Sequence, residues 1–477
     1  MLKKFLILIF VFALLLPACA GNDKPNETNK VGATETKPEI IDNLPERDFE
    51  GYNFRLFLPG TSGAGYYVKE ENGEIINDAI FERNRTVEER FNITISQVSY
   101  SVEWDDRMEG RNFILAGDDD FDLMVFHSIV AFEYAHEGLV LDWFEYMPYV
   151  DLSAVWWNQD VIKECSFFNK LYCINGDISY TALSNTLCLF FNKNLFDIYG
   201  IEYPYDDVEK GSWTFDKLLS ITKLGSSDLN GDGVITADAD RYGFDMANVY
   251  SYPTTALYCG GDRVIKKDSE GLPVLAVYNE RTVNIYEKLF DILRTNCAAI
   301  RDTALWGNPE NIDIFKDGRA LIGAGGMGTI VSYRAMEDEI GMLPAPKYDE
   351  TTPKYYSIVE AYGRLITVPV TANNLERLSI ITEALGAEGH RTIIPTYYER
   401  SLKTKFSRDV ESETMLDYIK DSAVYDYGYL NSGSLTGVLA IPVSVLIYSN
   451  NPDFTSHYNG NERSVHMNIE KLIEKFQ

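Results

Sequence analysis

The chain has 477 residues, which is too many for one hydrophobic core, so its length predicts two or more lobes. It is 45% hydrophobic and 24% charged, as expected of a globular protein. Its 43 basic and 72 acidic residues give a net charge of -29, and this excess argues against binding to nucleic-acid phosphates or to anionic lipid surfaces.

The first residues have the pattern of an export signal. Lys3 and Lys4 precede an apolar stretch over residues 5–16, which is too short to span a bilayer as a mature helix. The sequence Leu-Pro-Ala-Cys follows at 16–19, and a small residue before such a cysteine resembles the lipobox of bacterial lipoproteins. We therefore expect residues 1–18 to be a lipoprotein signal peptide and Cys19 to carry acyl chains. An ordinary secretory signal with an incidental cysteine is the alternative.

Residues 19–47 contain few apolar residues and many Asn, Thr, Lys, Glu and Pro, which predicts a flexible tether after the lipidated cysteine. Five further cysteines follow, an odd number that cannot pair completely within one chain. Cys165 and Cys173 are close enough in sequence to bridge, but we favour buried free thiols.

Strand-like and helix-like segments alternate from residue 52. Such alternation predicts the α/β class, with open sheets and helices on both faces. Thr214 is a candidate N-cap for one of the helices. By their apolar periodicity, strands are expected at 52–58, 92–98, 121–127 and 185–192, and helices at 75–91, 107–117, 212–225, 280–296, 374–394 and 412–423.

The stretch 228–240 has oxygen-bearing residues at the spacing of an EF-hand-like calcium loop, with Gly233 at the turn position. Position 12 is Ala239 rather than Glu, so a neighbouring Asp would have to complete the shell. An acidic loop with Asx turns is the alternative. The expected ligands of a structural calcium ion are Asp228, Asn230, Asp232, Val234, Thr236, Asp238 and Asp240. No other cofactor is expected.

Catalytic motifs are weak. The pair His136-Glu137 lacks the second histidine of H-E-x-x-H, and the five histidines have no metal-ligand spacing. Carboxylate pairs are too numerous in so acidic a chain to be informative. A glycosidase stays open as an alternative, because its acid and base can lie far apart in sequence.

Several phrases resemble, in order, the bacterial extracellular solute-binding proteins of family 1, the carbohydrate-type lipoproteins of ABC importers. Among them are DAIFERNRTVEERFNITI (78–95), LFFNKNLFDIYGIEYPYDDVEKGSWTFDKL (189–218), FKDGRALIGAG (315–325) and EIGMLPAPKYDE (339–350). The resemblance implies a two-lobe periplasmic-binding-protein-like fold of type II. Crossover strands would join the lobes, which would close on a ligand by hinge bending and deliver it to an ABC permease.

By this resemblance, lobe one would comprise residues 48–183 and 310–368, and lobe two residues 184–309 and 369–477. Crossovers are expected near Ser184, Pro309 and Pro369.

Residues 319–336 contain Gly323, Gly325 and Gly328, which spell the G-x-G-x-x-G of dinucleotide-binding proteins. The Pro-rich segment after them does not resemble the second strand of such a unit. The family resemblance implies instead a turn at the mouth of the cleft, where glycines let the backbone approach a ligand. From strand ends and from aromatics near the crossovers, the candidate ligand-binding residues are Thr61, Ser62, His127, Ser128, Trp157, Tyr180, Tyr258, Trp306, Gly325, Gly326 and Tyr362.

The sequence thus predicts a non-enzymatic, lipid-anchored monomer on the extracytoplasmic face of the membrane. It would capture a small uncharged solute, a sugar or an oligosaccharide, for an ABC permease. A secreted carbohydrate-active hydrolase and a lipoprotein that presents its ligand to a membrane sensor are the alternatives, and peptides or other small solutes stay open as ligands.

Overall fold

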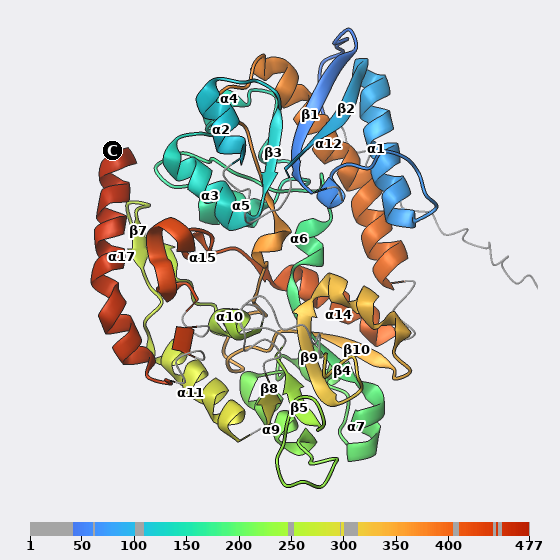
Figure 1. The fold of residues 1–477 in the computed structure, drawn as a ribbon, viewed down its shortest axis with the longest axis vertical. Helices are drawn as coiled ribbons and strands as arrows, with labels where there is room; N and C mark the ends of the chain where they lie inside the picture. Colours follow the sequence, from blue (N-terminus) through green and yellow to red (C-terminus); the bar gives the residue numbers. More distant parts are fainter. Residues whose placement is uncertain are drawn as a thin grey trace, which may run out of the picture. The chain divides into compact units, whose positions relative to one another are not determined.

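The computed structural model describes residues 42–60, 63–100, 109–246, 252–295, 297–299, 313–403, 410–441, 445–446 and 451–476 (Figure 1). The expected signal peptide, Cys19 and most of the tether lie outside the described residues, as do Thr61, Ser62, Trp306 and the expected crossover near Pro309. None of the helices described is both long enough and apolar enough to span a membrane.

The first sheet has four strands in the order β12-β3-β1-β2. β1 (Tyr52–Pro59) pairs in parallel with β2 (Ile93–Tyr100) and with β3 (Leu123–Phe126), while β12 (Leu365–Thr367) runs antiparallel to β3. The crossover from β1 to β2 is made by the helix α1 (Ile75–Phe91), as parallel strands require.

α1 follows its sequence pattern closely. Ile80, Val87 and Phe91 are buried at helical spacing, and Asn92 ends the helix in a left-handed conformation with φ 50. A second long helix, α12 (Leu375–Pro395), packs beside α1 (Figure 1). These two helices therefore belong with the first sheet.

The second sheet has five strands in the order β10-β4-β9-β5-β8. Its centre is the apolar pair β4 (Leu187–Asn192) and β9 (Ala320–Gly326), which run antiparallel. β10 (Ile340–Pro344) flanks β4. β5 (Tyr242–Asp245) and β8 (Ala298–Ala299) continue the sheet in parallel beyond β9.

The helix α9 (Phe215–Gly225) packs on β5. Thr214 is its N-cap, since its side chain accepts a hydrogen bond from the amide of Lys217, as the sequence predicted. The helix α9 and the strand β5 approach each other closely: a Cβ at Gly243 of β5 would lie 1.6 Å from the carbonyl oxygen of Thr222 of α9. Gly243 is therefore a contact point between helix and strand.

The strand pairing corrects the expected grouping of the chain. Residues 310–368 were assigned to lobe one, but β9 and β10 belong to the second sheet, because their apolar runs pair with β4. Residues 369–477 were assigned to lobe two, but the apolar face of α12 packs on α1 of the first sheet. Pro369 likewise bridges to Val140 within the first half. The chain passes between the sheets before β12, not near Pro369.

The remaining elements complete the two halves. The six helices expected from the sequence lie within a few residues of their expected ranges. The other α-helices are α2 (Glu109–Ala116), α3 (Ser128–Glu137), α4 (Trp143–Tyr146), α5 (Gln159–Cys165), α6 (Thr181–Ser184), α7 (Lys193–Tyr199), α8 (Tyr205–Lys210), α10 (Tyr252–Ala256), α11 (Glu280–Arg294), α14 (Val410–Ser422), α15 (Tyr427–Leu430) and α17 (Phe454–Phe476). Short strands are β6 (Ile265–Lys267), β7 (Pro273–Leu275), β11 (Ser357–Ile358) and β13 (Ala423–Val424), and helical turns used below are η3 (Met327–Ala335), η4 (Ala361–Gly363) and η5 (Thr396–Lys403).

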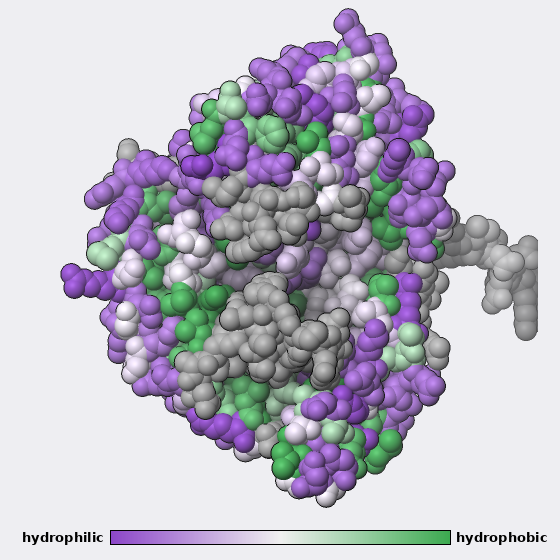
Figure 2. Space-filling model, viewed as in Figure 1, coloured by the Kyte–Doolittle hydropathy of each residue, from purple (hydrophilic) through white to green (hydrophobic). Residues whose placement is uncertain are grey.

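Buried apolar residues fill the space between these elements, and in the view of Figure 2 hydrophilic residues cover much of the surface. Cys165, Cys173, Cys188, Cys259 and Cys297 are all buried and free, as favoured from the sequence.

Candidate functional site

The register of both sheets brings two strand ends to the places where the chain crosses between them. Gly326, the last residue of β9, pairs with Leu187 at the start of β4. Phe126, the last residue of β3, pairs with Leu365 at the start of β12. The carboxyl ends of β9 and β3 thus adjoin the crossover segments 181–187 and 357–365. Open α/β sheets bind ligands at such ends.

The two crossover segments lie side by side. Thr186 forms an antiparallel bridge with Val359, and the amide of Glu360 donates to the carbonyl of Asn185 at 3.0 Å. The Asn185 side chain donates to the carbonyl of Tyr362 at 3.3 Å. These contacts join the two crossover segments directly to each other.

His127 stands directly after β3, and its ring meets that of Tyr362 edge to face, with centroids 4.8 Å apart. Burial, and secondarily the charge of Arg364, lowers the pKa of His127 to about 4, so the imidazole is neutral at physiological pH. Ser128, which begins α3, is buried. Tyr362 is 38% exposed.

A recess of about 250 Å³ lies beside the first crossover. The rings of Tyr180 and Tyr397 are stacked at its wall, with centroids 4.6 Å apart. The wall combines the start of α1, the residues around α6, the turn η3 that follows β9, and η5 that follows α12. Its described lining residues are Glu74, Ile75, Ile76, Tyr180, Ser184, Gly328, Val331, Arg334 and Tyr397.

The glycines of 323–328 serve close packing. A Cβ at Gly323 would lie 2.6 Å from the ring of Phe315, and one at Gly326 would lie 2.7 Å from the carbonyl oxygen of Ser184. At Gly328, a Cβ would lie 2.2 Å from the hydroxyl of Ser184. The turn after β9 is η3 rather than an α-helix. The G-x-G-x-x-G spelling therefore reflects the fit of β9 and η3 against the crossover, not a dinucleotide loop.

Two of the expected ligand contacts lie in the core. Trp157 is 1% exposed, and its indole nitrogen donates to Glu383 at 2.8 Å. Tyr258 is fully buried. Both side chains pack structural elements together. The structure places His127, Ser128, Tyr180, Gly325, Gly326 and Tyr362 on or beside the crossovers, whereas the side chains of Trp157 and Tyr258 are buried.

Sequence reasoning missed several residues of this region. Ser184 was recognised as a crossover residue but not as part of a recess. Arg334 and Tyr397 lie in helical turns that follow β9 and α12, where periodicity gives no signal. Pro395, which marks the end of α12, is the one feature that points to a change of direction before Tyr397.

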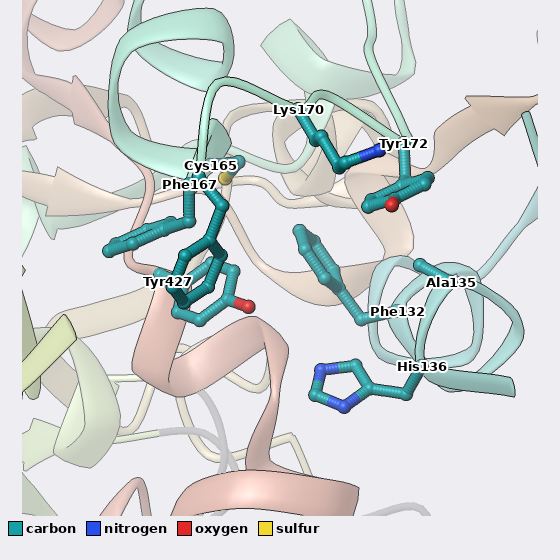
Figure 3. A pocket seen from close by; sticks show the side chains of 9 residues that line it. Phe132, Ala135, His136, Cys165, Phe167, Lys170, Tyr172 and Tyr427 are labelled. Atoms are coloured by element: carbon teal, nitrogen blue, oxygen red, sulfur yellow. The ribbon is translucent and has the colours of Figure 1, made fainter. Parts of the chain in front are cut away.

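A second, smaller pocket lies between α3, the loop 165–172 and α15 (Figure 3). The rings of Phe167 and Tyr427 are in contact, with centroids 4.1 Å apart, and Phe132 meets Tyr427 edge to face. The cavity holds about 20 Å³, room for roughly one water molecule. It is too small for a sugar.

The loop 228–240 uses its carboxylates to hold its own backbone. Asp228 accepts from the amides of Gly231 and Gly233, and Asp240 accepts from Leu229 at 2.8 Å and from Thr236 at 2.9 Å. These amide bonds lower the pKa of Asp240. Over the described ranges, no three His, Cys, Asp or Glu side chains are grouped to hold a metal. The loop therefore has the Asx turns of the alternative.

The comparisons with known proteins agree with this architecture. No family model matches the chain, and no curated protein matches it. Several solved structures, however, match the chain. UgpB from Mycobacterium tuberculosis, in complex with glycerophosphocholine, is 14% identical with a TM-score of 0.58, covering 89% of this chain and 99% of that one. A sugar transporter from Rhizobium etli in an open conformation is 13% identical with a TM-score of 0.58, covering 88% and 99%.

An ABC substrate-binding protein from Listeria monocytogenes, in complex with cycloalternan, is 13% identical with a TM-score of 0.54, covering 89% of this chain and 99% of that one. At sequence identities this low, similarity to these solved structures shows that the fold is shared. The chain has the two-lobe, type II fold of periplasmic-binding-protein-like proteins, as the sequence predicted.

Proposed function

We propose that the protein is the substrate-binding component of an ABC importer, which captures a neutral sugar or oligosaccharide by closing its two lobes on it. One observation carries the proposal: the carboxyl ends of β3 and β9 adjoin the same pair of crossovers, beside an aromatic-lined recess. The sugar transporter from Rhizobium and the ABC substrate-binding protein from Listeria in complex with cycloalternan, which share the fold, support it.

The chemistry of the region suits an uncharged, hydroxyl-rich solute. Tyrosine rings such as that of Tyr362 can stack on the apolar face of a pyranose. The neutral imidazole of His127 can donate or accept a hydrogen bond. Glu74 and Arg334 carry opposite charges, so the described lining of the recess has no net charge that would select an ion.

Closure would act through the crossovers. The recess is lined by α1 and η5 of the first half and by η3 of the second, so a rotation about residues 181–187 and 357–365 would change its width. A sugar that contacts both halves stabilises the closed state and shifts the population toward it. The closed form would then dock on the permease.

The remaining parts of the proposal concern the cell and the lobes. The protein would be a monomer, anchored by lipid at Cys19 on the extracytoplasmic face of the membrane. From the strand pairing, we place residues 42–180 and 365–403 in lobe one, and residues 187–357 and 410–476 in lobe two.

A thermal-shift screen tests the function. The mature chain is heated with glucose, tagatose, maltose, maltotriose or maltotetraose, and each sugar is then recovered and analysed by mass spectrometry. At one hundred times its Kd, a sugar bound only by the native state adds about 2.7 kcal/mol and raises Tm. We expect at least one sugar to raise Tm and to be recovered intact. Cleavage would favour the hydrolase, and an unchanged Tm with every sugar would refute the proposal.

A further inference from the structure

Arg83 is a cation buried in the first half of the molecule. Its side chain lies on α1 and is 1% exposed, and among the described residues it forms no ion pair. Burying a charge without a carboxylate partner costs free energy, and an apolar side chain of similar length would fill the same space without that cost. The arginine must therefore do something that an apolar residue cannot.

The guanidinium of Arg83 holds two backbone carbonyls. Its Nη1 donates to the carbonyl oxygen of Ile178 at 3.0 Å, and its Nη2 donates to that of Tyr66 at 2.6 Å. Tyr66 follows the turn η1 (Gly63–Gly65), and Ile178 lies just before the first crossover, so one side chain joins α1 to both segments. The planar fork of the guanidinium fixes its two acceptors relative to each other, which an apolar side chain cannot do.

The segment 177–179 is also packed closely on two other sides. A Cβ at Gly65 would lie 2.7 Å from Oγ of Ser179. A Cβ at Gly389 of α12 would lie 2.0 Å from the carbonyl oxygen of Asp177. The segment is therefore confined between η1 and α12, and the guanidinium holds its middle residue.

The confined segment leads directly into Tyr180. The ring of Tyr180 stacks on that of Tyr397 at the wall of the recess. The next residue, Thr181, donates through its hydroxyl to the carbonyl oxygen of Gly363 on the second crossover at 3.2 Å. The backbone position of Ile178 therefore determines where the Tyr180 ring stands in the recess.

We propose that Arg83 is a positioning residue for solute binding: by fixing the backbone at Ile178, it sets the place of the Tyr180 ring in the recess. This inference rests on the proposed function and adds to it a residue that acts only through Tyr180. Arg83 is not among the described residues that line the recess, and its burial keeps it from the solute. A ring that contacts a ligand binds it well only when the groups behind the ring hold it in place.

A double-mutant cycle tests this coupling. It compares Arg83→Met, Tyr180→Ala and the double variant with the wild type. Kd is measured by calorimetry for each of the five sugars named above that the wild type binds, at a temperature where every variant is folded. Each single substitution should weaken binding about tenfold, the effect of losing one well-placed aromatic contact. The double variant should bind within about twofold of Tyr180→Ala, because Arg83 acts through that ring.

Val87→Ala is the matched control for a loss of stability. Val87 lies one turn further along α1 and is buried, so its truncation leaves a cavity and lowers Tm. It should bind each sugar as the wild type does, because an apolar side chain donates no hydrogen bond to Ile178. An equal loss of affinity in this control would assign the effect of Arg83→Met to general destabilisation and overturn the inference.

Two further results would overturn the inference and leave the proposed function standing. One is a Kd within about twofold of the wild type in either single variant of the cycle. The other is a loss in the double variant that equals the product of the two single losses. If Arg83→Met does not fold, Arg83→Lys, which keeps the charge but not the planar fork, replaces it in the same cycle. If the wild type binds none of the five sugars, the proposed function fails, and the inference fails with it.

Discussion

Glu383 is a carboxylic acid held in the core of the first half. Its side chain on α12 is fully buried, and its Oε2 accepts from the indole nitrogen of Trp157 at 2.8 Å. Burial raises the pKa of Glu383 from 4.5 to about 7. The folded state therefore binds this proton more tightly than the unfolded state does.

This residue should make stability depend on pH. Because the folded-state pKa is the higher one, the free energy of unfolding should fall as the pH rises from about 4.5 to about 7, by at most roughly 3 kcal/mol. Glu383→Gln should remove this contribution. Urea denaturation of both proteins at pH 5 and pH 8 measures the difference. If Glu383→Gln kept the pH dependence of the wild type, the account of Glu383 would be wrong.

At the scale of single residues, the sequence indicated the region of the site better than its members. His127 and Tyr362 could be selected because they follow a strand or adjoin a crossover. Trp157 and Tyr258 were selected for the same chemistry, but aromatic side chains serve cores as well as ligands. Burial, which separates the two roles, depends on packing between segments that are distant in sequence.

At the scale of elements, the contact of α9 with β5 gives a sharp prediction. In Gly243→Ala, the new methyl group would meet the backbone of Thr222, which cannot move aside as a side chain can. We expect a loss of at least about 2 kcal/mol in the free energy of unfolding, measured by chemical denaturation. Gly460→Ala is the matched control. It lies in α17 with no atom within 4 Å of the new Cβ, so it should gain up to about 1 kcal/mol. A neutral Gly243→Ala would contradict the close packing.

The loop 228–240 gives a second prediction at this scale. Because its carboxylates already accept backbone amides and no metal-holding group is formed in the described chain, calcium should not contribute to stability. Tm in excess EDTA and in excess calcium chloride should agree within about 1 °C. A clear rise of Tm with calcium, abolished in Asp228→Asn, would restore the calcium site.

Where apolar residues recur with a strong period, both the position and the type of the element could be predicted from the sequence. The segment 75–91 is a helix over its whole expected length, because its apolar residues recur at helical spacing. The pairing of β9 and β10 was not predictable in the same way. A buried apolar run shows that a strand needs covered faces but not which sheet supplies its neighbours, so the sheet membership of 320–344 became clear only from the register.

At the scale of the whole molecule, the two-lobe fold was predictable because ordered phrases along the chain resemble one family, although each is weak alone. The lobe boundaries were not predictable in the same way, because the chain crosses between the sheets more than once. A resemblance to a family indicates the order of segments along the chain, but not which strands or helices each segment packs against. The crossovers at 181–187 and 357–365 join the two sheets that surround the proposed site.

Small-angle X-ray scattering of the mature chain, with and without the sugar that raises Tm most, tests the central claim most directly. The account predicts a smaller radius of gyration at saturating sugar, since rotation about the crossovers brings the lobes together, and full recovery of the sugar. Identical scattering curves with and without the bound sugar, or a sugar returned in fragments, would contradict capture by lobe closure.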